Sequence, residues 1–188
     1  MNNSLSKSPD IVVFDLETSG MNCEEDSIIE IGAVKVRGGK VIDEFHYFVA
    51  CPQPLSKEVE QLTGIKNKDI ASAPSVKEVL ENFYVFADDC ILAAYHLPFQ
   101  YDFLEYYGKL SGIKFDNERL DILPLVQEKL KEKVCNYKLS TVAENLGIVY
   151  NKSNVLGETK AAAAILITIK GFTKRVNYEC YIRKANTT

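Results

Sequence analysis

The sequence predicts an α/β domain in which helices flank a mixed sheet. An apolar run rich in β-branched residues, 11–14, leads into a turn and predicts a buried strand. Two further runs, 28–36 and 41–49, flank a Gly-Gly pair and predict a β-hairpin, which completes a three-stranded antiparallel meander. Helical patterns then alternate with a short apolar run at 90–94, which is typical of a central parallel strand.

Serine residues mark the start of the first two predicted helices. Ser56 is an N-cap for a helix that ends at about Leu62, where Gly64 provides a left-handed C-cap. Ser75 caps the next helix, whose apolar residues recur at helical spacing. Four more helices are predicted at 99–110, 121–133, 137–146 and 156–169.

Length and charge predict one folded domain between two polar ends. The chain has 188 residues, 46% of them hydrophobic, which is enough to bury one substantial core. We expect a flexible N-terminus at 1–10, a domain at 11–170 and a basic tail at 171–188. From residue 170 onward there are five Lys or Arg against one Glu. A solvated tail and a phosphate-contacting arm are both open for this segment.

Composition also bears on the compartment and on partners. The formal net charge of −4 provides no global basic surface for holding duplex DNA, so nucleic acid needs a local site. The five cysteines form no C-x-x-C pair, which argues against a zinc site or a disulfide framework and for reduced thiols in a cytoplasm. No apolar run is long enough to span a bilayer, and no membrane partner is expected.

Two carboxylates follow the first strand. Side chains alternate along a strand, so Asp15 and Glu17 face the same side, where like charges repel and resist desolvation. A divalent cation between them would remove that conflict. The alternative is that both carboxylates reach water at the end of the strand.

Several short segments, taken in order and spacing, resemble those of the DEDDh 3′-to-5′ exonucleases. This is the family of the proofreading epsilon subunit of bacterial DNA polymerase III and of ribonuclease T. The resemblance covers nearly the whole chain and implies a ribonuclease H-like fold. The segments that carry it are 14–20 (FDLETSG), 28–34 (IIEIGAV), 62–65 (LTGI), 71–74 (ASAP) and 136–148, from NYKLS to GI.

The resemblance implies two-metal hydrolysis of a phosphodiester at a nucleic-acid 3′ end. Four carboxylates would hold two Mg²⁺ or Mn²⁺ ions while a histidine takes a proton from the attacking water. On this basis Asp15 would bridge the metals and Glu17 would complete one shell. Backbone around Thr18 and Ser19, together with Phe99, would contact the terminal nucleotide.

Three of the five catalytic positions implied by the resemblance depart from the family pattern. Gln100 stands where the third carboxylate belongs, and Asn154 and Thr159 stand where the histidine and the fourth carboxylate belong. The ligand charge thus falls from −4 to −2, and asparagine is no general base near neutral pH. We expect weak or single-site metal binding through Asp15 and Glu17, with hydrolysis impaired or lost.

Nearby ionisable residues are the candidates for rescue of this chemistry. Asp102 lies two residues after the lost carboxylate, and His96 lies just before the helix. A shift of two positions turns a side chain to about the opposite face of a helix, so Asp102 is expected in solvent. Glu158, beside Thr159, is expected to be rotated away to the surface.

Three functions therefore stand open. The first is an exonuclease-family protein that binds a single-stranded nucleic-acid 3′ end or a nucleotide with little or no hydrolysis. The second is an active metal-dependent 3′-5′ exonuclease with rearranged catalytic residues. The third is a non-catalytic interaction module that docks onto a polymerase or another replication or repair protein.

Overall fold

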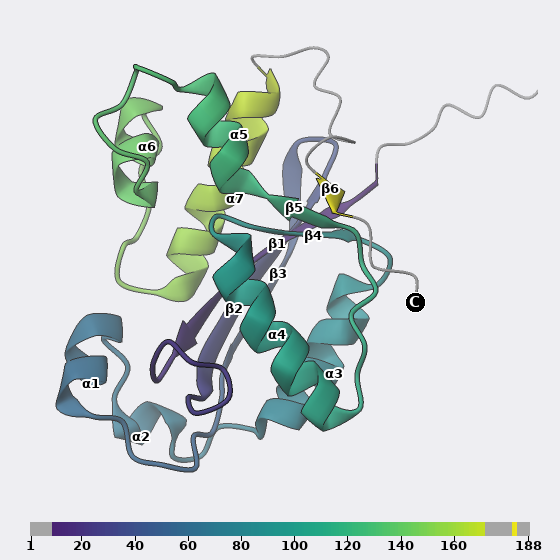
Figure 1. Cartoon of the computed structure of the whole chain (residues 1–188), viewed down its shortest axis with the longest axis vertical. Helices are drawn as coiled ribbons and strands as arrows, with labels where there is room; N and C mark the ends of the chain where they lie inside the picture. The colour runs from purple at the N-terminus through teal and green to yellow at the C-terminus, as the bar shows by residue number, and fades with distance from the viewer. Residues whose placement is uncertain (1–8, 172–181, 184–188) are drawn as a thin grey trace, which may run out of the picture.

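A six-stranded mixed sheet forms the centre of the protein. The structure is a computed structural model that describes residues 9–171 and 182–183. Its strand order is β3-β2-β1-β4-β5-β6, and helices cover both faces (Figure 1). The predicted α/β fold is confirmed. Residues 1–8 of the predicted N-terminus and most of the predicted basic tail lie outside the described residues.

The first three strands form the predicted antiparallel meander. They are β1 (Ile11–Thr18), β2 (Ile28–Arg37) and β3 (Lys40–Phe48), each antiparallel to the next. Gly38 and Gly39 have positive φ angles of 57° and 77°, as a tight hairpin turn requires. The pairing sets the register in which the two acidic side chains of β1 meet those of β2.

The other half of the sheet begins with parallel strands. The strand β4 (Ile91–Ala94) runs parallel to β1, and β5 (Arg119–Asp121) runs parallel to β4. A two-residue strand, β6 (Ile182–Arg183), is antiparallel to β5. Our sequence prediction missed β5, because three residues are too few to show a period.

The helices match the predicted order, with small differences at their ends. Ser56 and Ser75 cap the helices that follow them, and Gly64 has a φ of 78°. The helix predicted at 121–133 is shorter, and a four-residue helix after Lys66 was not predicted. The helices are α1 (Lys57–Thr63), α2 (Asn67–Ile70), α3 (Val76–Ala87), α4 (Leu97–Ser111), α5 (Ile122–Lys129), α6 (Leu139–Asn145) and α7 (Val155–Gly171).

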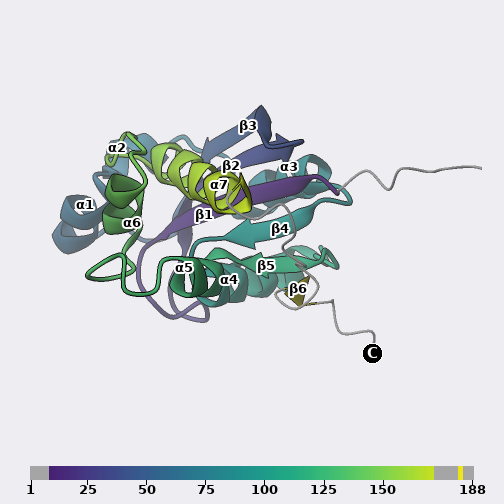
Figure 2. The ribbon, with the colours of Figure 1, turned by 90° about the horizontal axis from the view of Figure 1, so that it is seen from above.

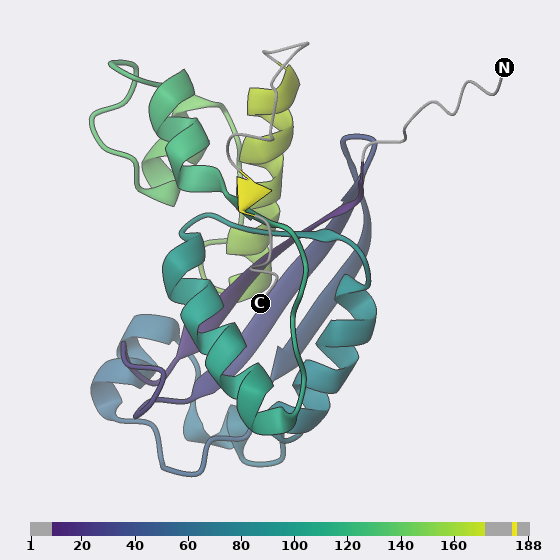
Figure 3. The same cartoon turned by 45° about the vertical axis from the view of Figure 1, so that its right-hand side comes forward.

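The two faces of the sheet carry separate cores. Alternate residues of β1, such as Phe14 and Leu16, pack with α3 and α4. Their neighbours Ile11 and Val13 pack on the opposite face with α5, α6 and α7. Figure 2 shows α7 lying along the sheet over β1 and β2, and Figure 3 shows α3 and α4 on the other side. None of the helices in the described part of the chain is long and apolar enough to cross a membrane.

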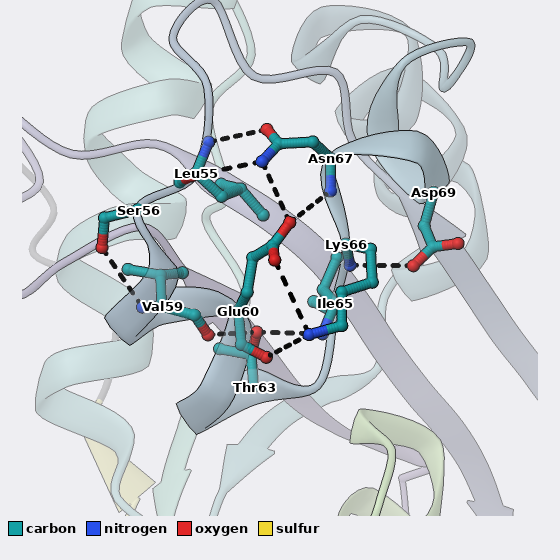
Figure 4. A network of polar contacts seen from close by, with 9 residues as sticks. All are labelled: Leu55, Ser56, Val59, Glu60, Thr63, Ile65, Lys66, Asn67 and Asp69. Carbon is teal, nitrogen blue, oxygen red and sulfur yellow. Dashed lines mark hydrogen bonds and ion pairs between the residues drawn. The ribbon is translucent and has the colours of Figure 1, made fainter.

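Side-chain hydrogen bonds hold the connection between α1 and α2 (Figure 4). The Glu60 carboxylate accepts from the Asn67 backbone N–H at 2.9 Å and from its side-chain Nδ2 at 3.0 Å. Asn67 Oδ1 in turn accepts from the Leu55 N–H at 2.8 Å, and Lys66 Nζ lies 3.7 Å from Glu60. This network fixes the turn at 63–65, one of the segments that carried the family resemblance.

Gly32 of β2 lets α7 approach the sheet closely. A Cβ at this position would lie 2.8 Å from Val155 Cγ1 and 3.2 Å from both Leu156 N and Thr159 Oγ1. Real Cβ atoms are essentially never found at the shortest of these distances. The first turn of α7, which carries Thr159, therefore depends on the absence of a side chain here.

We predict that Gly32→Ala lowers the free energy of unfolding by roughly 1–3 kcal/mol, the usual cost of overpacking a filled core. Urea denaturation followed by circular dichroism measures the change. Gly112→Ala is not a suitable control, because Gly112 has a φ of 75°. Gln127→Ala, at an exposed position on α5, is a better one, and an equal effect of both substitutions would contradict the prediction.

Candidate functional site

Asp15 and Glu17 lie at the carboxyl end of β1, on the face covered by α7. Phe14 and Leu16 point into the opposite core, so the alternation of the strand fixes this orientation. Figures 1 and 3 both show β1 ending beside the first turns of α4 and α7. Burial, followed by the charge of Glu17, raises the pKa of Asp15 well above its ordinary value.

Gln100, in the first turns of α4, contacts Asp15 directly. Its Nε2 donates to Asp15 Oδ1, and its Oε1 accepts from the Leu16 backbone N–H at 2.9 Å. The residue is only 8% exposed. The side chain for which the resemblance predicted the third-carboxylate position therefore gives Asp15 a hydrogen-bond donor instead of adding a carboxylate.

Thr159 is fully buried in α7 and hydrogen-bonded within the protein. Its Oγ1 lies 2.8 Å from the Val155 carbonyl oxygen and 3.3 Å from the Gly32 carbonyl oxygen. A hydroxyl has one proton, so the two carbonyls share it. This hydroxyl, for which the resemblance predicted the fourth-carboxylate position, contributes to the contact between α7 and β2.

Asn154 lies immediately before α7 and is exposed. Its Oδ1 accepts from the Gly157 backbone N–H at 2.7 Å, which is an N-cap interaction. Gly157 itself is needed because a Cβ there would lie 2.0 Å from the Asn151 carbonyl oxygen. The side chain for which the resemblance predicted the position of the family histidine thus caps a helix.

The expectation that Glu158 points away to the surface was wrong. Glu158 is half-buried, and its charge raises the pKa of both Asp15 and Glu17. Burial raises the pKa of Glu158 as well. The close packing of α7 on Gly32 turns Thr159 into the sheet, which brings position 158 toward the end of β1. The sequence alone does not give the orientation of α7 about its own axis, because the packing on Gly32 sets it.

A buried glutamate of β2, hydrogen-bonded to an exposed histidine of β3, adjoins the site, and the sequence analysis missed this pair. Glu30 is 2% exposed and pairs in register with Glu17 across the two strands. His46 Nε2 lies 2.5 Å from Glu30 Oε1. The sequence did carry a sign of this pair. Glu30 is a single acidic residue within an apolar strand that must neighbour β1.

The residues expected to contact nucleic acid lie at the turn after β1. The Thr18 hydroxyl donates to the Gly20 carbonyl at 2.6 Å. Ser19 Oγ accepts from the Ser27 N–H at 2.9 Å and lies 3.4 Å from Asp26 Oδ1. These bonds occupy both hydroxyls in shaping the turn. The assignment of this turn to a terminal nucleotide stays a prediction.

The other candidates lie on α4 or just before it. The ring of Phe99 is half-buried with its centroid 5.2 Å from that of Phe103. His96, just before α4, and Asp102 are exposed. Asp102 lines a hollow of about 930 Å³ between α4 and β5 that includes Arg119 but none of the carboxylates at the end of β1. Asp102 therefore does not take the place of the missing carboxylate.

The donor set does not fit the two-ion centre that the family resemblance implies. Asp15 already accepts from an amide, Thr159 donates to carbonyls, and Asn154 caps a helix. Within the described residues, no group of three or more His, Cys, Asp or Glu side chains is placed to hold a metal ion. The carboxylates of Asp15 and Glu17, which remain, repel each other.

Stability should depend on pH through Glu17. Burial, then the charges of Glu158 and Glu30, raises the pKa of Glu17 from 4.5 to about 7. Between these values the folded state holds a proton that the unfolded state has lost, so the free energy of unfolding falls as pH rises. We expect a loss of about 1–3 kcal/mol across this range.

The measurement is urea denaturation in EDTA at about pH 5 and about pH 8. Glu17→Gln should remove much of the pH dependence and should stabilise the protein at the higher pH. Glu128→Gln, at an exposed position on α5, is the matched control. An unchanged pH dependence in Glu17→Gln would contradict the assignment.

Comparison with known proteins gives the family. The model of the exonuclease family RNase_T matches residues 12–153. The PolC-type DNA polymerase III of Thermotoga maritima is 32% identical over 167 residues, which are 88% of this chain and 12% of that protein. The Caldanaerobacter subterraneus protein of the same name is 37% identical over 159 residues, 84% of this chain and 11% of that protein. The chain thus spans about a tenth of the length of these relatives.

Solved structures show the same fold. Exonuclease X in complex with 5′ overhanging duplex DNA has a TM-score of 0.73 at 17% identity, covering 91% of this chain and 97% of that one. E. coli exonuclease I in complex with a dT13 oligonucleotide has a TM-score of 0.75 at 12% identity, covering 87% of this chain and 41% of that one. With its sheet order and the matched segment, this chain belongs to the exonuclease family.

Proposed function

We propose that this protein binds a single-stranded nucleic-acid 3′ end or a nucleotide at the end of β1, with phosphodiester hydrolysis impaired or lost. The observation that carries the proposal is the state of Gln100, Thr159 and Asn154. We assign each of the three to a catalytic position of the family, and each side chain is engaged in a hydrogen bond within the protein. None can supply a carboxylate ligand or a general base.

The binding part of the proposal draws on the family and its structural neighbours. Solved exonucleases of this fold hold DNA, as in the dT13 and 5′ overhanging duplex complexes. In this chain Thr18, Ser19 and Phe99 would contact the terminal nucleotide. Mg²⁺ or Mn²⁺ would bind weakly, at one site at most, through Asp15 and Glu17. The PolC-type relatives favour a polymerase as partner. A cytoplasmic location is part of the proposal and is supported by the absence of any C-x-x-C pair in the sequence.

A second candidate function rests on Glu158. After burial, its charge is among the causes that raise the pKa of Asp15 and of Glu17, so a third carboxylate acts on those two at the end of β1. An exonuclease with rearranged catalytic residues would use Glu158 in place of the lost carboxylate. In that case Glu158→Gln would abolish activity that the unsubstituted protein shows.

The decisive experiment follows a 5′-labelled single-stranded oligonucleotide with Mn²⁺. We expect binding by fluorescence anisotropy, weakened by salt, and no shortening that depends on Asp15. Asp89→Ala, at the exposed turn before β4, is the control for Asp15→Ala. Shortening that disappears in both Asp15→Ala and Glu158→Gln but not in the control would favour the rearranged exonuclease.

A gain-of-function variant tests whether these three side chains limit hydrolysis, separately from nucleic-acid binding. The triple substitution Gln100→Asp, Asn154→His and Thr159→Asp restores the residue types of the family. We expect it to gain metal-dependent shortening, with the histidine alone contributing about 10²- to 10⁴-fold. Absence of oligonucleotide binding by the unsubstituted protein at moderate salt, together with recovery of a bound partner on purification, would favour a non-catalytic interaction module instead.

A further inference from the structure

The orientation of the Gln100 amide is fixed by its two partners. A backbone N–H can only donate, so the atom 2.9 Å from Leu16 N must be the oxygen of the amide. The nitrogen then faces Asp15 Oδ1, to which it donates. The reverse orientation would set two donors against each other at Leu16 and two acceptors against each other at Asp15. The amide thus presents a donor to the carboxylate.

The side chain is held in this place from both ends. Gln100 is 8% exposed, and the buried residues Phe103 and Leu104 anchor the same helix in the core. At the other end the amide bridges the side chain of Asp15 and the backbone of the next residue in β1. In a metal-dependent relative this carboxylate would face a cation. In this protein it faces an N–H group of Gln100 that is held in place.

We infer that the Gln100 amide takes the place of a divalent cation at Asp15, so that the site is assembled without metal and a cation gains Asp15 only by displacing the amide. The inference concerns the site of the proposed function and rests on that function only for the location of the site. It explains why the donor set does not fit two ions. The alternative is that the side-chain carbonyl oxygen of Gln100 is itself a metal ligand, and the inference excludes this role.

The two roles of Gln100 make opposite predictions for Mn²⁺ binding. If the amide competes with the cation, Gln100→Ala binds Mn²⁺ more tightly than the unsubstituted protein. We expect a dissociation constant lower by roughly tenfold or more, the equivalent of one lost hydrogen bond to a charged group. Gln100→Glu, which also adds a carboxylate ligand, should bind more tightly still. If the carbonyl is a ligand, Gln100→Ala binds more weakly.

Mn²⁺ is titrated into the metal-free protein without nucleic acid, and free Mn²⁺ is measured by electron paramagnetic resonance. Gln127→Ala, an exposed glutamine on α5, is the control and should match the unsubstituted protein. Equal or weaker Mn²⁺ binding by Gln100→Ala would overturn the inference, and so would tight binding of two ions by the unsubstituted protein. Because no oligonucleotide is present, failure here is distinct from failure of nucleic-acid binding.

The variants should keep the fold, because the Leu16 N–H also lies 3.1 Å from Asp15 Oδ1 and retains that acceptor. Thermal unfolding in EDTA checks this for each protein. Gln100→Met keeps the chain length of the side chain but has no N–H donor, and it should also bind Mn²⁺ more tightly than the unsubstituted protein. If the Ala and Met variants both bind Mn²⁺ more tightly, the cause is the loss of the donor and not the loss of packing. If neither variant binds Mn²⁺ more tightly, the inference is overturned.

Discussion

The structure depends on how it accommodates like charges at the end of β1. Strand alternation and the register with β2 bring Asp15, Glu17 and Glu30 to one face, and α7 adds Glu158. The compensation visible in the structure is supplied by protein donors. Gln100 donates to Asp15, and His46 pairs with Glu30. Burial still raises the pKa of Asp15, Glu17 and Glu158, and neighbouring carboxylates add to this effect at Asp15 and Glu17.

Gln100, Asn154 and Thr159 have one property in common, which is that the fold uses each side chain in a hydrogen bond. Thr159 shares its proton between α7 and the strand at Gly32, whereas Asn154 caps the helix that carries Thr159. A carboxylate at 159 would lie buried beside the Gly32 carbonyl oxygen, where an unpaired charge is costly. Residues that act as a unit are strongly non-additive, so restoring one position leaves the others arranged for a different purpose.

Much of this could be predicted from the sequence, because it rests on local signals. The β1–β3 meander, the serine caps and the parallel strand follow from periodicity, turn residues and capping. The strand β5 could not be predicted, since three residues carry no period. Glu158 was placed wrongly for another reason: its direction depends on how closely α7 packs on Gly32, which is a tertiary contact. The role of Gln100 likewise needs the distance between α4 and β1.

The charge at the site also constrains how a nucleic acid could bind. A phosphodiester is an anion, and carboxylates without cations repel it, so exchanging metals for an amide removes the attraction on which the family site relies. The amide lowers the repulsion at Asp15 but supplies no positive charge. Contacts with a 3′ end would then have to come from neutral groups, such as the backbone around Thr18 and Ser19, and from stacking on Phe99. Because carboxylates dominate the site, protonation of Glu17 near its raised pKa of about 7 would lessen the repulsion and favour binding on the acid side of neutrality.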